Sequence, residues 1–324
     1  MFVSGSYATY RKSTLLRLRQ EIWRRSIFPY DGLTHPVNLD AHLATAAMHK
    51  VAVAHVTTLG DDKYLEYAIE KQSRVLETFV PLLSNPTPDE TRTLFALSAL
   101  VTIWSFASRC LPPQLNIVSR MPFETTRATE EFSKKRHHLA DLISIMNISR
   151  GIGAVVDQCR PWFKDQGLCG MLGSRDTPTQ ALGMEGCEAL DEVFESIQNG
   201  FHYSNRLNTY SAAIHRTKTY LRGFSPDRRS HAAVGWPVGL PQLFMKALAD
   251  HEPPALVILA FWCACVFATP DWWAQGWSKG VISEIESYLP QWWRRHLEWP
   301  LAVLEDAPSG VGFVDVDEEM YGAM

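Results

Sequence analysis

The sequence predicts an all-α protein, a single-domain orthogonal helical bundle with a hydrophobic pocket among its C-terminal helices. Apolar residues recur at spacings of three and four along most of the chain, which is the helical period. Few segments alternate polar and apolar residues, so we find no sheet. The chain has 324 residues and 46% hydrophobic content, which is enough for one large core.

The chain divides into three regions. Residues 1–34 are expected to form a basic N-terminal helix and linker, residues 35–306 an all-helical ligand-binding domain, and residues 307–324 an acidic flexible tail. In the first region Leu15, Leu18 and Ile22 recur at helical spacing among basic residues. We interpret this helix as one that packs on the domain, and a membrane-surface or nucleic-acid arm is the alternative.

Four helices are predicted in the first half of the chain, over residues 39–59, 63–83, 91–110 and 130–158. The first is rich in alanine, and Gly60 ends it. The second carries one apolar stripe, and the third is apolar nearly all round, which predicts burial. Gly151 and Gly153 lie inside the fourth, where we interpret them as a place of close helix packing.

Two loops and six helices are predicted in the second half. Residues 167–186 are rich in glycine and polar residues, and residues 223–241 contain several prolines and glycines, so both are interpreted as loops. The helical patterns cover residues 188–198, 205–222, 239–253, 255–268, 272–289 and 291–305.

Composition excludes several classes of protein. The net charge of −4 supplies no field for nucleic acid, so we expect no direct nucleic-acid binding. No apolar run reaches the ~18 residues that cross a bilayer, and no signal peptide is recognisable, so we expect no membrane span and a cytoplasmic location. Six scattered cysteines without a C-x2-C pair are expected to be free thiols.

Motifs for metal, phosphate and terpene ionisation are missing. His42, His49 and His55 share one predicted helix, but their spacing is too long for one ion. The two glycines of the fourth helix do not follow a strand, and no G-K-[ST] loop is present. Asp61 and Asp62 begin a helix rather than a cluster of acids. We therefore expect neither a metal nor a cofactor.

Aromatic residues concentrate near the C-terminus. Seven of the eleven tryptophans lie between Trp262 and Trp299. The predicted helix from Ala255 is apolar on two sides, with Trp262 on one and Phe261 and Cys265 on the other. Polar atoms there are few, and a largely apolar region with sparse polar groups is typical of a small-molecule site. The alternative is that the rings fill the space themselves.

Several segments together resemble the C-terminal ligand-binding domain of fungal zinc-cluster regulators of the sterol-uptake type. They span residues 35–305 and read LATAAMHKVAVAHV, YLEYAIEKQSRVLETFVPLL, LFALSALVTIWSFAS, ISRGIGAVV, PPALVILAFWCACVF, WWAQGW and WWRRHLEWP. The resemblance implies an all-helical domain that buries a sterol-like ligand. It implies pocket residues at Phe261, Trp262, Cys265, Trp273 and Trp277, and His49 corresponds to the family's helix histidine; to these we add Trp236 and Trp104. The six-cysteine zinc cluster of those regulators has no counterpart here, so direct gene regulation is not expected.

Three functions are compatible with these observations. The first is a cofactor-independent cyclase or Diels–Alder-type enzyme of secondary metabolism, in which an apolar pocket holds a reactive conformer of a terpenoid or polyketide. The second is a stand-alone sterol-sensing regulator domain, nuclear rather than cytoplasmic, that acts through a DNA-binding partner. The third is a lipid carrier. All three predict a lipophilic ligand, and a homodimer is among the possible assemblies. We place the cyclase first.

Overall fold

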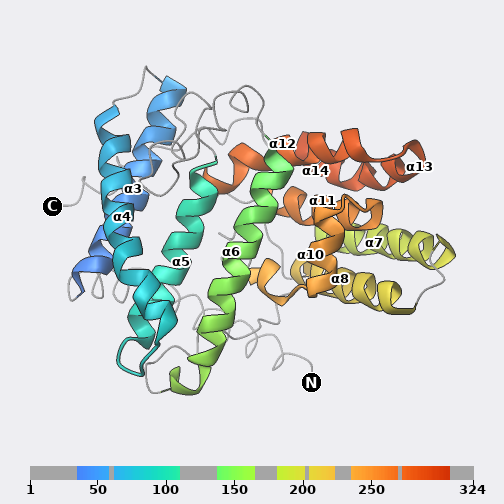
Figure 1. Cartoon of the computed structure of the whole chain (residues 1–324). Coiled ribbons are helices and arrows are strands. Elements are labelled where there is room, and N and C mark those ends of the chain that lie inside the picture. Colours follow the sequence, from blue (N-terminus) through green and yellow to red (C-terminus); the bar gives the residue numbers. More distant parts are fainter. Residues whose placement is uncertain are drawn as a thin grey trace, which may run out of the picture.

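The computed structural model describes seven stretches of the chain, residues 35–57, 62–109, 137–164, 181–200, 204–222, 235–268 and 272–306. Their secondary structure is α-helix with short 3₁₀ turns, and these stretches contain no strand (Figure 1). The all-α class is therefore confirmed. The predicted N-terminal helix and the acidic tail lie outside the described residues.

Four long helices build the first half of the molecule. They are α3 (Pro36–Thr57), α4 (Asp62–Ser84), α5 (Thr91–Ala107) and α6 (His138–Gln158), with the short turn η5 (Arg160–Trp162) after the last. Helix α3 packs against α4 and α5, and α5 packs against α6 (Figure 1). The boundaries lie close to those predicted from periodicity, except that residues 130–136 of the fourth predicted helix are outside the described residues.

Shorter helices build the second half around α11 (Pro253–Phe267). The others are α7 (Ala181–Gly200), α8 (Ser204–Arg222), η6 (Pro237–Gly239), α10 (Gln242–Ala249), α12 (Trp272–Tyr288), α13 (Gln291–Arg294), η7 (Arg295–Leu297) and α14 (Glu298–Asp306). Helix α11 contacts α7, α8, α10, α12 and α14. Every residue from Pro254 to Val266 is buried, as a helix that is apolar on all sides requires.

The two halves share one hydrophobic core. A single cluster of buried side chains includes Met48 of α3, Leu142 of α6, Val193 of α7 and Val303 of α14. Helix α12 joins the halves, since it packs on α5 and α6 as well as on α11. A second cluster, with Val75, Phe79 and Leu97, fills the space among α3, α4, α5 and α6. The orthogonal arrangement and the three-region division stay predictions.

The predicted loop over residues 167–186 is wrong at its C-terminal end. Helix α7 already begins at Ala181 and includes Gly183 and Gly186. A Cβ on Gly186 would lie 2.6 Å from Cζ2 of Trp299, so the missing side chain lets α14 approach α7. The glycines that suggested a loop include one that serves tertiary packing. The predicted close approach at residues 151–153 is confirmed at Gly153 only, where a Cβ would lie 2.4 Å from Val238 Cγ1.

One described helix, α6, is long and apolar enough to cross a membrane. Helices α10 and α11 pass the same test as a pair that is bent by 100°. The core helix of a soluble protein also passes it, and α11 is buried from Pro254 to Val266, whereas 39% of the apolar stretch of α6 is buried. The expected lack of a membrane span stays a prediction.

Candidate functional site

Seven buried aromatic rings lie in one continuous series of contacts, which we call the ring chain. Its members come from α8, α10, the segment before η6, α11, α12 and α5, and in order they are Tyr210, Phe244, Trp236, Trp262, Trp277, Phe106 and Trp273. The chain therefore links helices of both halves of the molecule.

Trp262 lies between two other indoles. Its ring stacks on Trp236 with centroids 4.9 Å apart and an interplanar angle of 12°, and on Trp277 with centroids 5.7 Å apart. Phe106 extends the stack, with its centroid 5.3 Å from that of Trp277. Such contacts stabilise a fold beyond the burial of apolar area alone. Trp262 is thus the centre of the ring chain.

Trp236 enters the ring chain from a segment that was predicted to be a loop. Arg216 of α8 donates from Nε to the Trp236 carbonyl oxygen at 2.7 Å. Arg150 of α6 donates from Nη1 to the Pro237 carbonyl oxygen at 3.1 Å. Two arginines from separate helices thus hold this segment, and neither contact could be found from sequence spacing. The one indication in the sequence that this segment belongs to the core is the single tryptophan before Pro237.

The three stacked indoles differ in their hydrogen bonds. Trp236 Nε1 donates to Thr217 Oγ1 at 3.2 Å, and Trp277 Nε1 donates to the Trp273 carbonyl oxygen at 2.9 Å. Trp262 Nε1 is buried and has no acceptor. A buried donor without a partner costs about 1–3 kcal/mol, so most buried polar groups in native proteins are paired. The indole N–H at the centre of the stack is the exception.

The eight site residues predicted from the sequence divide into three groups: members of the ring chain, residues on another side of α11, and two residues elsewhere. Trp236, Trp262, Trp273 and Trp277 come together in the ring chain. Phe261 and Cys265 lie on another side of α11, where Phe261 stacks on Trp299 with centroids 5.0 Å apart.

Two further predicted residues lie outside the ring chain. Trp104 is buried in the same core, and its indole N–H also has no acceptor. His49 is exposed on α3, so its assignment to a buried pocket is wrong. The spacing of His49 from His42 predicts that both residues lie on one helix. It does not predict which face of α3 the neighbouring helices cover.

Three ring-chain residues were not predicted, namely Phe106, Tyr210 and Phe244. Thr217, the acceptor beside the stack, was not predicted either. Tyr210 and Thr217 lie on α8 and Phe244 on α10, while Phe106 lies on α5, which is apolar nearly all round. Their membership depends on how α5, α8 and α10 pack, so no local signal identifies them.

The expected pocket among the C-terminal helices is not confirmed between these rings. The rings touch one another, and the cavity that Trp277 borders together with Arg109, His138 and Asp141 holds only about 10 Å³. That is room for about one water molecule rather than a terpene skeleton. Stacked and tilted aromatic rings reach the close packing of a protein interior, so they fill the space themselves.

The ionisable groups at α11 include a buried thiol and, at its N-terminus, a paired carboxylate. Burial raises the pKa of the Cys265 thiol well above its usual range, so the thiol stays neutral and acts as a small apolar side chain. Burial, and donation of its hydroxyl to Glu252, raise the pKa of Tyr210. Arg206 pairs with the same carboxylate.

No three metal-ligating side chains gather among the described residues.

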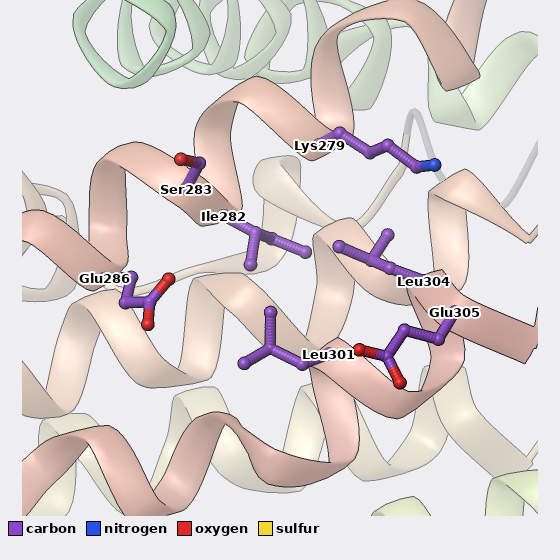
Figure 2. Close-up of a pocket in the computed structure, with 7 residues that line it drawn as sticks. All are labelled: Lys279, Ile282, Ser283, Glu286, Leu301, Leu304 and Glu305. Atoms are coloured by element: carbon purple, nitrogen blue, oxygen red, sulfur yellow. The ribbon is translucent and has the colours of Figure 1, made fainter.

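A larger hollow lies away from the ring chain, between α12 and α14. It is an open groove of about 330 Å³ with Ile282, Leu301 and Leu304 at its centre (Figure 2). No local sequence pattern identifies this groove, because its two walls come from separate helices.

Comparison with known proteins gives no match, whether with family models, with the sequences of curated proteins or with solved structures.

Proposed function

We propose that this protein binds a lipophilic small molecule that carries an acceptor oxygen, and that the ring chain is its binding site. The observation that supports the proposal is the buried N–H of Trp262, which has no acceptor although the indoles on both sides of it are satisfied. A carbonyl or hydroxyl oxygen of a ligand would accept this hydrogen bond.

The surroundings of Trp262 favour an apolar ligand body. The neighbouring side chains in the stack are Trp236, Trp277 and Phe106, and all are buried. A charged ligand would lose its hydration here without gaining a counter-ion. A terpenoid, sterol or polyketide with one or two oxygens meets both conditions, and the resemblance to sterol-binding regulator domains agrees with this class.

Binding must displace a ring, since the rings are in contact. A ligand that separates Trp262 from Trp277 would shift α11 relative to α12, and Phe106 would carry the change to α5. Ligand affinity would then be coupled to the arrangement of three helices. Such coupling is what a ligand-sensing domain needs, so we place a sensor first.

Catalysis of an intramolecular cyclisation is the second candidate. The Trp262 N–H could polarise the carbonyl of a dienophile in apolar surroundings. A catalyst of this kind also needs a preformed chamber for the reactive conformer, whereas the ring contacts leave the ligand to open its own space. We therefore place the sensor before the cyclase, whereas the sequence alone favoured the cyclase.

Ligand titrations with a matched pair of variants test the binding proposal. The panel contains sterols, oxygenated terpenoids and polyketides, each with the hydrocarbon of closest shape, and tryptophan fluorescence reports binding. Trp262→Phe keeps a ring and removes the unpaired N–H. Trp277→Phe removes an N–H that already has an acceptor. We expect Trp262→Phe to weaken binding of the oxygenated ligand about 5- to 10-fold, the effect of one hydrogen bond.

The hydrocarbons and the control define the contrary result. Trp277→Phe should affect an oxygenated ligand and its hydrocarbon equally. If no panel member binds saturably, and native mass spectrometry of protein from two expression hosts retains no lipophilic molecule, the binding proposal is wrong. Incubation with linear polyene precursors separates the two candidates, since only a cyclase returns a cyclised product faster than buffer does.

A further inference from the structure

A small polar cavity borders the ring chain. It lies where the end of α5 and the start of α6 meet α12, three helices that pack against one another (Figure 1). Its polar lining residues are Arg109, His138 and Asp141, and Trp277 is the ring-chain residue that borders it. The cavity holds about 10 Å³, which is room for about one water molecule. A hydroxyl group of a ligand needs similar room, so it could take the place of that water.

Arg109 and Asp141 offer a hydroxyl group both a donor and an acceptor. Asp141 Oδ1 lies 3.3 Å from Arg109 Nη1, whereas a close charge-assisted hydrogen bond measures about 2.7–2.9 Å. A hydroxyl beside this pair would donate to the carboxylate and accept from the guanidinium. Each of these two side chains is 29% exposed, while Trp277 is buried. The polar pair therefore marks the outer side of the cavity, and the indole marks the side that faces the core.

The charges at the cavity favour a neutral ligand group. Arg109 and Asp141 have opposite charges, and Glu284 of α12 adds a carboxylate at the same end of α6, where its Oε2 accepts from the Leu139 N–H at 3.0 Å. A ligand carboxylate would meet two protein carboxylates, and like charges at short range repel. A ligand ammonium would compete with Arg109 for Asp141. A hydroxyl keeps its hydrogen bonds here and needs no counter-ion.

We infer that the ligand of this protein is a neutral molecule with two oxygens, a hydroxyl that binds in the cavity beside Arg109 and Asp141 and a second oxygen that accepts the hydrogen bond of Trp262. Trp277 joins the two positions, because it stacks on Trp262 and borders the cavity. The inference rests on the proposed function and narrows its ligand class. A hydroxyketone or diol of a terpenoid, sterol or polyketide belongs to that class, and an acid or a molecule with a single oxygen does not.

Two matched sets of ligands test this assignment by titration calorimetry at about pH 8, where an ordinary histidine is neutral. The steroid set is epiandrosterone, which carries a hydroxyl and a ketone, its methyl ether, and androstanol, which lacks the ketone. The second set carries the same three patterns of oxygen on a decalin skeleton, so the two sets differ in the distance between the oxygens. In the parent protein we expect the hydroxyketone that fits to bind about tenfold more tightly than its methyl ether, the effect of one hydrogen bond to a charged group.

A pair of double variants locates the hydroxyl. Arg109→Leu/Asp141→Leu removes both polar groups and leaves no unpaired charge between them. We expect it to bind the hydroxyketone and its methyl ether within about twofold of each other. Asp157→Leu/Arg160→Leu is the matched control, because it removes an exposed pair of the same two residue types at the other end of α6. The control should keep the tenfold preference of the parent.

Trp262→Phe separates the two oxygen positions. It should reduce the preference for the hydroxyketone over the ketone-free alcohol and leave the preference over the methyl ether unchanged. A preference for the hydroxyl that is lost in Trp262→Phe but kept in Arg109→Leu/Asp141→Leu would overturn the inference, while the proposed function would stand.

The parent protein alone also supplies contrary results. A methyl ether that binds as tightly as its hydroxyketone would overturn the inference even if the double variant at the cavity does not fold. The same holds if neither set binds although ligands with a single oxygen do. If no lipophilic ligand of any kind binds, the proposed function is wrong as well, so the two failures are distinguishable.

Discussion

Trp236 and Trp262 stack on each other, yet only one indole N–H is satisfied. Trp236 donates to Thr217, whose own hydroxyl donates to the Ala213 carbonyl oxygen at 2.9 Å. Trp262 is as deeply buried and has no acceptor. A buried donor that stays unpaired lowers stability, and the indole N–H groups of Trp104 and Trp299 are buried without an acceptor as well. This difference can be measured without any ligand.

Unfolding of two variants isolates the hydrogen bond. Trp236→Phe and Trp262→Phe remove the same atoms from neighbouring rings. Only Trp236→Phe also breaks a hydrogen bond, the one to Thr217. We expect Trp236→Phe to lower the free energy of unfolding by about 1 kcal/mol more than Trp262→Phe does. Urea titration followed by circular dichroism measures both. An equal or larger loss in Trp262→Phe would show that its N–H has an acceptor.

His296 makes stability depend on pH. Burial, and then the neighbouring Arg295, lower the pKa of His296, against the opposing effect of Glu192 and Glu298. In the unfolded chain the imidazole takes up a proton near its usual pKa of about 6.5, so below that pH the unfolded state binds more protons than the folded state. Stability is therefore lost as pH falls through this value.

Replacing the imidazole tests this account. We expect His296→Gln to reduce the loss of stability between about pH 7.5 and 5.5, since the unfolded chain then lacks this proton uptake. Urea titrations at several pH values measure it, and His215→Gln, which alters an exposed histidine on α8, is the control. An unchanged pH dependence in His296→Gln would assign the effect to other groups.

Helix α6 shows how one element combines a free face with a crowded one. Gly151 and Gly153 are two residues apart and therefore point in nearly opposite directions. A Cβ on Gly151 would meet nothing within 4 Å, whereas a Cβ on Gly153 would collide with Val238 of η6. The same helix also holds the Trp236 segment through Arg150. The close approach at Gly153 thus supports the ring chain.

Alanine at the two glycines should act in opposite directions. Gly151→Ala should stabilise the protein by about 0.5–1 kcal/mol, because alanine restricts the unfolded chain and favours helix. Gly153→Ala should destabilise it by about 1–3 kcal/mol, because η6 must move away. Thermal unfolding measures both. Stabilisation by Gly153→Ala would mean that Val238 yields at little cost.

The molecule as a whole is held together by the core that α12 shares with both halves. Its buried side chains come from helices between α3 and α14, and the ring chain crosses from α5 to α8. Residues far apart in sequence are therefore stabilised by the same contacts. A ligand that opens the ring chain would change the packing between the halves.

Cooperative unfolding is the expected consequence. We expect tryptophan fluorescence and far-ultraviolet circular dichroism to give the same urea midpoint, as a shared core requires. Most tryptophans lie in the second half, so a dichroism transition that precedes the fluorescence change would show that α3, α4 and α5 unfold by themselves. That result would also contradict a single domain over residues 35–306.

Helical periodicity by itself determined the class of this protein and most of its helices. The apolar faces of α4 and α5 and the all-apolar α11 follow from the spacing of their residues, which backbone geometry converts directly into a face. The concentration of tryptophans between Trp262 and Trp299 likewise contains three members of the ring chain, and Trp236 lies outside it. Local composition misled at Gly186, because packing decides whether a glycine marks a loop. The family resemblance misled at His49, because packing decides which face of α3 is covered.

Only the tertiary structure decided that the rings touch. The sequence specifies which aromatic side chains are present, but whether they enclose a cavity or fill it depends on the distances between α5, α11 and α12. The same distances leave Trp262 without an acceptor and bring Leu301 and Leu304 beside Ile282. Such distances follow from the packing of whole helices, a sum over many weak contacts that no short stretch of sequence contains.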